Sequence, residues 1–188
     1  SRGVSVSLAL ALLLLAPPPP GAGAPPPASA AAVAPTFEEM WSAWVKAEAS
    51  GDAPAAEVAL RQMRRARIER NARTVVARCR ASGINVVGVT KGTCGMPQVA
   101  RAMLRGGVTG IGESRFENIR RLRASGIDAP VMLLRSPPLS LIEEVMKTVD
   151  ISLNSELATI RELSRVAERM ARVHDIILMV DLGDLREG

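Results

Sequence analysis

The sequence predicts an α/β protein built on a parallel sheet, and two observations lead to this fold class. Short apolar runs typical of buried strands recur roughly every 20–25 residues after Gly83. The stretches between these runs have helical patterns, and Gly106, Gly107 and Gly126 mark helix ends. Strands that alternate with helices at this spacing indicate βα units, in which successive strands lie parallel.

The elements of this pattern follow one another in order along the chain. Strands are predicted at residues 84–89, 108–112, 130–134, 150–153 and 175–180. Helices are predicted at residues 97–105, 115–125, 139–148 and 155–173, and Pro97 and Ser155 suit helix starts. The sequence therefore predicts about five βα units, fewer than the eight of a complete barrel.

Three regions are expected along the chain. Residues 1–35 form a signal-like leader, in which an apolar run too short to span a bilayer precedes a Pro/Ala-rich tract that we expect to be disordered. Residues 36–82 are expected to form two helices. Thr36 and Glu39 form a capping-box pattern for the first helix, whose Trp41 and Trp44 need a partner such as the arginine-rich second helix. Residues 83–188 carry the βα pattern.

The chain is basic, with a net charge of +5. The charge is concentrated on the second helix, in Arg61, Arg64, Arg65, Arg67, Arg70, Arg73, Arg78 and Arg80. Such a helix could attract RNA, but no aromatic residues are interleaved for base stacking, so we interpret it as a solvated face and expect no nucleic-acid partner. Cys79, Cys94 and the single His174 have no metal-ligand spacing, so we expect no metal site and assign His174 no role.

Polar residues follow every predicted strand: Thr90-Lys91, Glu113-Ser114-Arg115, Arg135-Ser136, Asn154-Ser155 and Asp181. Ligands bind at the carboxyl ends of strands in parallel α/β folds. Lys91 is the most informative of these residues, because it directly follows a core-like strand and the chain has only three lysines. A desolvated amine can form a Schiff base, whereas the alternative interpretation is a strand-end lysine that reaches solvent.

Four ordered motifs resemble the alanine racemase superfamily of pyridoxal-phosphate-dependent (fold type III) enzymes, and most closely its ornithine racemase-like branch. They are VGVTKGTCG at 87–95, GIGESRFEN at 110–118, DISLNSE at 150–156 and VDLGDLREG at 180–188. The resemblance covers residues 71–188. It implies the N-terminal part of a PLP-binding (β/α)₈ barrel, so the chain is expected to be a fragment that can be inactive alone.

The resemblance also implies roles for individual residues. Lys91 would form the internal aldimine with pyridoxal 5′-phosphate and act as one acid/base when the α-proton of an amino acid is abstracted. Arg186 would contact the phenolic oxygen of the cofactor, and Ser114 and Asn154 would line the pocket. The acid/base on the opposite face is a Tyr in alanine racemases, but this chain has no Tyr. We do not expect Cys94 to replace it.

The resemblance implies a small-molecule amino-acid substrate, a homodimer at full length and a cytoplasmic location. Export is the alternative if the leader is a genuine signal peptide, and no stable membrane span is expected. A second functional interpretation is a non-catalytic PLP-binding homeostasis protein of the same barrel superfamily. Its second-strand motif usually reads Gly-Glu-Asn, however, where this chain has Gly112-Glu113-Ser114. A third interpretation is a Schiff-base aldolase without cofactor.

Overall fold

The predicted alternation of strands and helices is confirmed by the computed structural model, which describes residues 6–7 and 35–183. The five predicted strands are β2 (Val87–Val89), β3 (Gly110–Glu113), β4 (Val131–Leu133), β5 (Ile151–Asn154) and β6 (Asp175–Leu178). Most are shorter than the apolar runs that predicted them. An apolar run reports burial, whereas a strand also requires a hydrogen-bonded neighbour.

All strand pairs in the sheet are parallel, and the strand order is β1-β6-β5-β4-β3-β2. The strand β1 (Val6–Ser7) lies within the predicted leader and pairs with β6, a contact that the sequence did not predict. The rest of the predicted leader up to residue 34, with its signal-like run, lies outside the described residues, as does Arg186.

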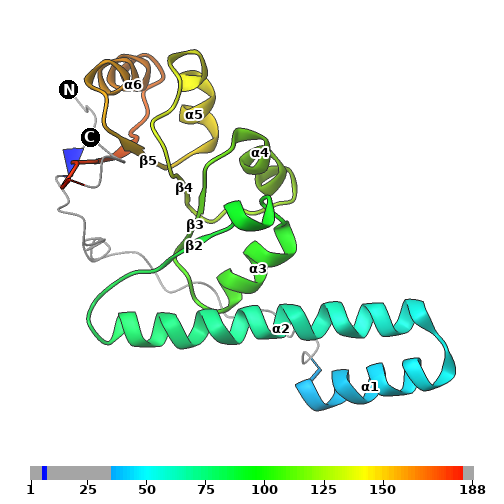
Figure 1. Cartoon of the computed structure of the whole chain (residues 1–188). Helices are drawn as coiled ribbons and strands as arrows, with labels where there is room; N and C mark the ends of the chain where they lie inside the picture. The colour runs from blue at the N-terminus through cyan, green and yellow to red at the C-terminus, as the bar shows by residue number, and fades with distance from the viewer. Residues whose placement is uncertain (1–5, 8–34, 184–188) are drawn as a thin grey trace.

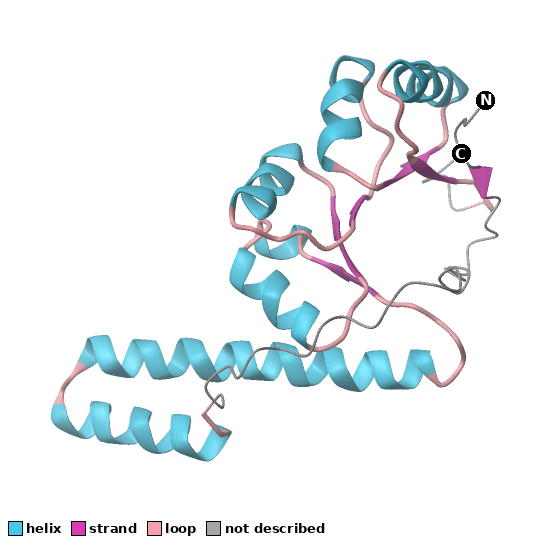
Figure 2. Ribbon diagram, turned by 180° about the vertical axis from the view of Figure 1, so that it is seen from behind, coloured by secondary structure: helices cyan, strands magenta, loops and turns pink. Residues whose placement is uncertain are grey.

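Four helices cover one face of the sheet (Figures 1 and 2). They are α3 (Pro97–Arg105), α4 (Phe116–Ala124), α5 (Ile142–Thr148) and α6 (Leu157–Arg169). Short 3₁₀ turns, η1 (Lys91–Thr93) and η2 (Leu139–Leu141), precede α3 and α5. Ile111, Leu133 and Ile176 are buried among the residues of this helical layer. Neighbouring strand residues point to the opposite face, where Val89 is 44% exposed.

The two predicted helices of the region 36–82 form a hairpin, α1 (Phe37–Ser50) and α2 (Ala53–Arg80). The predicted capping box is confirmed, because the Glu39 backbone N–H donates to Thr36 Oγ1 at 3.2 Å and the Thr36 N–H donates to Glu39 Oε2 at 2.6 Å. Gly51 ends α1 in the left-handed conformation, with φ of 71°. The chain then returns, so that α1 lies beside the first half of α2 (Figure 1).

The packing of α1 differs from the expectation for its tryptophans. Met40 and Ala47 are the buried residues of α1, and Ala56, Ala59 and Met63 are buried on the first half of α2. Trp41 remains 49% exposed. The arginine-rich helix therefore does accept α1, and the fully buried side chains are small or flexible, whereas Trp44 is only half-buried.

The second half of α2 packs against α3, so this contact joins the predicted helical region 36–82 to the region that carries the βα pattern. Val76 joins the core cluster that contains Ile111. The helices approach closely at Gly106, where an added Cβ would lie 2.5 Å from the Ala72 Cβ. Arg105 Nε lies 2.8 Å from Glu69 Oε2 across the same contact. None of the described helices combines the length and apolar character needed to cross a membrane.

Candidate active site

The polar strand ends gather along one edge of the sheet, as the sequence predicts. Because all strands are parallel, their carboxyl ends share one edge. Thr90 and Lys91 follow β2, Glu113 ends β3 with Ser114 next to it, and Asn154 ends β5. The sheet thus brings β2 and β3 directly together, whereas β5 is separated from β2 by two strands.

A buried carboxylate joins the ends of β2 and β3. Thr90 and Glu113 are both fully buried, and Thr90 Oγ1 donates to Glu113 Oε2 at 3.1 Å. The other carboxyl oxygen, Oε1, accepts the backbone N–H of Ser114 at 2.7 Å and that of Arg115 at 3.4 Å. These donors compensate the cost of burying the carboxyl group. We call this arrangement the Thr90–Glu113 bridge.

The bridge holds the backbone on which Lys91 sits. The Thr90 N–H donates to the Gly112 carbonyl at 3.0 Å, which extends the ladder between β2 and β3 past the last strand residue. The Thr90 carbonyl accepts the N–H groups of Thr93 at 2.9 Å and Gly95 at 3.2 Å, which closes the turn that begins at Lys91. The backbone at Lys91 is therefore fixed by hydrogen bonds to β3 on its N-terminal side and by the hydrogen bonds of the turn on its C-terminal side.

The Lys91 side chain itself is exposed at this edge. Within the described part of the chain it forms no hydrogen bond or ion pair, so its amine is available to a ligand. Cys94, three residues later, is also exposed and has a φ of 52°. The guanidinium of Arg121, on α4, donates to the Cys94 carbonyl and ties the end of this turn to the helical layer.

Asn154 is fully buried at the end of β5 and belongs to a second polar group. Its Nδ2 donates to Ser152 Oγ at 2.9 Å and to the Ser152 carbonyl at 3.0 Å. Ser152 Oγ lies 2.8 Å from His174 Nε2. Burial lowers the pKa of His174, although its hydrogen bond to the Val149 backbone acts in the opposite direction. A neutral imidazole that accepts from Ser152 fits this environment.

Of the predicted pocket residues, Ser114 lies close to Lys91, whereas Asn154 lies farther away. Ser114 is half-buried and follows the strand beside that of Lys91. Asn154 ends β5, which is three strand spacings from β2. Because adjacent strands are about 4.8 Å apart, Asn154 lies about 14 Å across the sheet from the end of β2. In the parallel register Asn154 pairs with Leu178, and Ser152 pairs with Ile176, which faces the helices. The side chain of Asn154 is therefore on the helix-facing side, and its Oδ1 has no partner there among the described residues.

The supporting roles of two residues, Glu113 and His174, were not predicted from the sequence. Glu113 stands out as an acid after an apolar strand, but nothing local reveals its contact with Thr90. His174 was assigned no role, yet it is buried and anchors Ser152. A signal for His174 does exist, since a single histidine directly before an apolar strand is expected to be buried with a hydrogen-bond partner.

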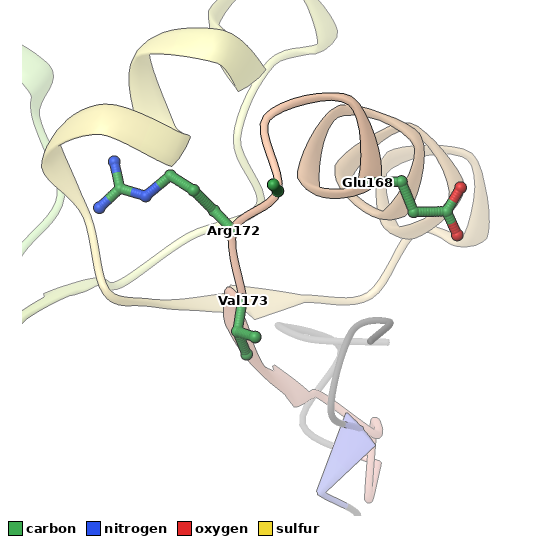
Figure 3. A pocket seen from close by; sticks show the side chains of 4 residues that line it. Glu168, Arg172 and Val173 are labelled. Carbon is green, nitrogen blue, oxygen red and sulfur yellow. The ribbon is translucent and has the colours of Figure 1, made fainter. Parts of the chain in front are cut away.

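A hollow in the described surface lies far from this edge. Figure 3 shows it between the end of α6 and the start of β6, lined by Glu168, Ala171, Arg172 and Val173. This position is at the amino end of β6, the edge opposite to the one that carries Lys91. The side chains of Glu168 and Arg172 point away from each other, so they do not converge on a ligand position. We therefore place the candidate site at the Lys91 edge.

A racemase family model and several curated relatives named as racemases match this chain. The family model described as alanine racemase, N-terminal domain, matches residues 63–188. A lysine racemase from Thermotoga maritima is 41% identical over 121 residues, which are 64% of this chain and 34% of that protein. An ornithine racemase from Acetoanaerobium sticklandii is 37% identical over 118 residues, 63% of this chain and 33% of that protein.

The solved structures agree with the fold. The alanine racemase from E. faecalis superposes with a TM-score of 0.57 at 18% identity, covering 66% of this chain and 34% of that one. This likeness concerns the fold alone, and it supports the interpretation of the five strands β2 to β6 and their four covering helices as the N-terminal part of such a barrel. The chain spans about a third of the length of the curated relatives that it matches.

Proposed function

Because the chain belongs to the alanine racemase family through its N-terminal domain, we propose that it is the N-terminal barrel portion of a pyridoxal-phosphate-dependent amino-acid racemase. The resemblance inferred from the four sequence motifs is confirmed by this membership and by the racemase relatives. The observation that carries the proposal is the position of Lys91, at the carboxyl edge of a parallel sheet and beside the Thr90–Glu113 bridge.

Two observations support the fit of these residues to pyridoxal phosphate. The Lys91 amine is exposed and unpaired within the described residues, as covalent attachment to an aldehyde requires. The backbone around Lys91 is held by buried hydrogen bonds, so the amine is presented from a rigid position. Lys91 would hold the cofactor, and Ser114 from the adjacent strand end would lie beside it. Arg186 remains a candidate contact from the resemblance.

In the proposed reaction, the bound cofactor supplies an electron sink for the negative charge left on the α-carbon. The contribution of the chain is to move a proton at Lys91 Nζ, which removes or returns the α-proton on one face of the substrate. Racemisation also requires a proton donor on the opposite face. These 188 residues contain no tyrosine, so in the proposed full-length enzyme this donor is either another residue type of this chain or a residue of the remaining part of the enzyme.

We propose a basic amino acid as the first substrate to test. The two relatives described above are named lysine racemase and ornithine racemase, and these names direct the choice. Interconversion of the D and L forms by the full-length protein, followed by chiral chromatography, would distinguish a racemase from a non-catalytic cofactor-binding protein. Unchanged enantiomers of lysine, ornithine and alanine would favour the binding protein.

Trapping tests the lysine assignment. The chain would be incubated with pyridoxal phosphate, reduced with borohydride, digested and mapped by mass spectrometry. Lys46 on α1 and Lys147 on α5 are both exposed and serve as internal controls. We expect Lys91 to be modified at least about tenfold faster than either, because only it lies at the carboxyl edge of the sheet. The Lys91→Ala variant should lose this fast modification, and Lys147→Ala should keep it.

Two outcomes would contradict the assignment. Equal modification of the three lysines would mean that the edge forms no cofactor site. Fast modification that persists in Lys91→Ala would place the site at another lysine. Reaction of Lys91 with substrate carbonyl compounds when pyridoxal phosphate is absent would favour the aldolase interpretation.

A further inference from the structure

One face of α2 carries a row of basic and polar side chains with no acidic residue among them. Its members alternate at spacings of four and three residues, so they stay within an arc of about 80° on an α-helix. All of them are exposed: Arg64, Arg67, Asn71, Thr74 and Arg78. We call this set the basic stripe. It is about 21 Å long, since a helix rises about 1.5 Å per residue.

The packing contacts of α2 leave the basic stripe uncovered. The residues buried against α1 lie about 65° around the helix from it, and those on the side of α3 lie about 145° away. Arg67 and Arg78 form no ion pair with another described residue. Arg64 acts electrostatically on Glu57, whose ion-pair partner is Arg61 at 2.7 Å. The stripe therefore presents positive charge that the fold itself does not neutralise.

Two exposed aromatic residues of α1 lie on the same side of the hairpin. Phe37 is 50% and Trp41 49% exposed, and they lie about 90° around α1 from the residues buried against α2. The helices are antiparallel, so rotations in the same sense point to one side, and the start of α1 lies beside the middle of α2, near Arg64 and Arg67 (Figure 1). Trp44 is half-buried, and its ring centroid lies 5.1 Å from that of Trp41, so it supports the exposed ring.

This arrangement removes the reason for expecting no nucleic-acid partner, which was the lack of aromatic residues among the arginines of α2. The tertiary structure supplies such residues from α1. Single-stranded nucleic acids are bound where basic side chains hold the phosphates and aromatic rings stack on unpaired bases. We propose that the basic stripe, together with Phe37 and Trp41, binds single-stranded RNA or DNA. Arg64, Arg67 and Arg78 hold the backbone, and Trp41 and Phe37 stack on bases.

The shape of the charged surface favours a flexible strand over an anionic membrane. A flat membrane would also meet Glu48, which is exposed near the turn, and it requires an apolar face to insert, whereas the stripe is polar from Arg67 to Arg78. A strand can follow α2 without reaching Glu48. The hairpin projects beyond the sheet and its four covering helices, so a strand has access to it (Figures 1 and 2). Because α1 lies outside the residues 63–188 that match the family model, the proposal does not depend on the racemase assignment.

Binding of a labelled 12-nucleotide oligouridine to the 188-residue chain tests the aromatic part of the site. By fluorescence anisotropy we expect a Kd of about 1–100 µM at ~0.1 M salt. The only two tryptophans are on α1 and there is no tyrosine, so quenching of the intrinsic fluorescence reports stacking directly. Trp41→Ala should raise the Kd at least about fivefold. Val58→Ala is the matched control, since Val58 is 53% exposed on the opposite side of α2. Equal weakening by both variants, or equal quenching by a 12-base-pair RNA duplex, would refute the stacking.

The salt dependence of the same binding tests the basic stripe. Each phosphate neutralised on a single strand contributes about −0.7 to the slope of the logarithm of the binding constant against that of the salt concentration, so three arginines predict a slope of about −2. Arg67→Gln and Arg78→Gln should each reduce its magnitude by about 0.7, whereas Arg67→Lys should keep it. Arg161→Gln, at an exposed position on α6, is the control with a charge removed elsewhere.

Three results would overturn the proposal. The first is no binding of the oligonucleotide at low salt. The second is an equal change of slope in Arg161→Gln, which would mean that the whole basic chain, and not the stripe, attracts the strand. The third is sedimentation of the chain with phosphatidylglycerol vesicles while the oligonucleotide does not bind, which would assign the face to a membrane.

Discussion

Replacing Thr90 by Val removes one hydroxyl from the Thr90–Glu113 bridge while keeping the volume of the side chain. Thr90 is fully buried, and its Oγ1 donates to Glu113 Oε2 at 3.1 Å. A hydrogen bond to a charged group contributes about 1.5–3 kcal/mol, and the Glu113 oxygen left behind has no route to solvent. We expect the free energy of unfolding to fall by that amount.

Thermal and urea unfolding measure this loss. For a chain of this length ~1 kcal/mol lowers Tm by about 2–4 °C, so we expect Thr90→Val to lower Tm by about 3–12 °C. Thr90→Ser keeps the hydroxyl and loses one methyl group, and should cost only about 1 kcal/mol. Borohydride trapping provides the second readout. Lys91 should be modified more slowly in Thr90→Val than in Thr90→Ser, because Thr90 carries the backbone that presents the amine.

The reasoning would be refuted by either of two results. If Thr90→Val unfolds at the same temperature as the parent chain, the contact with Glu113 contributes nothing to stability. If Thr90→Val is no more destabilised than Thr90→Ser, the hydroxyl contributes no more to stability than the methyl group does, and the hydrogen bond to Glu113 is not the main stabilising contact of Thr90. A double-mutant cycle with Glu113→Gln isolates the pair, and we expect a coupling energy of at least about 1 kcal/mol.

Two further predictions concern the packing around the site. Burial lowers the pKa of His174 below its ordinary value of 6.5, so the unfolded chain takes up a proton that the folded chain resists, and the free energy of unfolding should fall as pH drops below 6.5. His174→Gln should lose that part of the pH dependence in urea unfolding, and an unchanged slope would contradict it. Gly106→Ala would place a Cβ 2.5 Å from the Ala72 Cβ, so we expect a loss of about 1–3 kcal/mol from overpacking. Gly92→Ala, with no atom within 4 Å of the added Cβ, is the control for unfolding, and equal stabilities of the two variants would show that α2 and α3 can separate at no cost.

Much of the architecture is local in origin and was therefore predictable. The apolar runs and helical patterns of residues 83–180 predicted five strands and four intervening helices in the correct order, because the period of hydrophobic residues differs between strands and helices. The capping box at Thr36 and Glu39 was predicted because its partners are three residues apart. The position of Lys91 at the carboxyl edge follows from the same strand pattern, since parallel strands share that edge.

The contacts that support the site are not local and were not predicted. Thr90 and Glu113 are 23 residues apart, and Ser152 and His174 are 22 apart. Each pair meets only because adjacent parallel strands are aligned in one register, and a shift by one residue would turn each side chain to the other face. The burial of Asn154 on the helix-facing side, rather than in a pocket with Lys91, follows from the same alternation.

The tertiary structure also decided which face of α1 is buried. The sequence by itself determined that residues 37–50 form an amphipathic helix with two tryptophans, and the pattern alone suggests that the largest apolar side chains face the partner. The close approach of α1 to α2 instead accommodates Met40 and Ala47 against Ala56 and Ala59, because small residues allow two helices to pack tightly. Periodicity specifies that a helix has an apolar face, whereas the shape of the neighbouring helix determines which side chains fit against it.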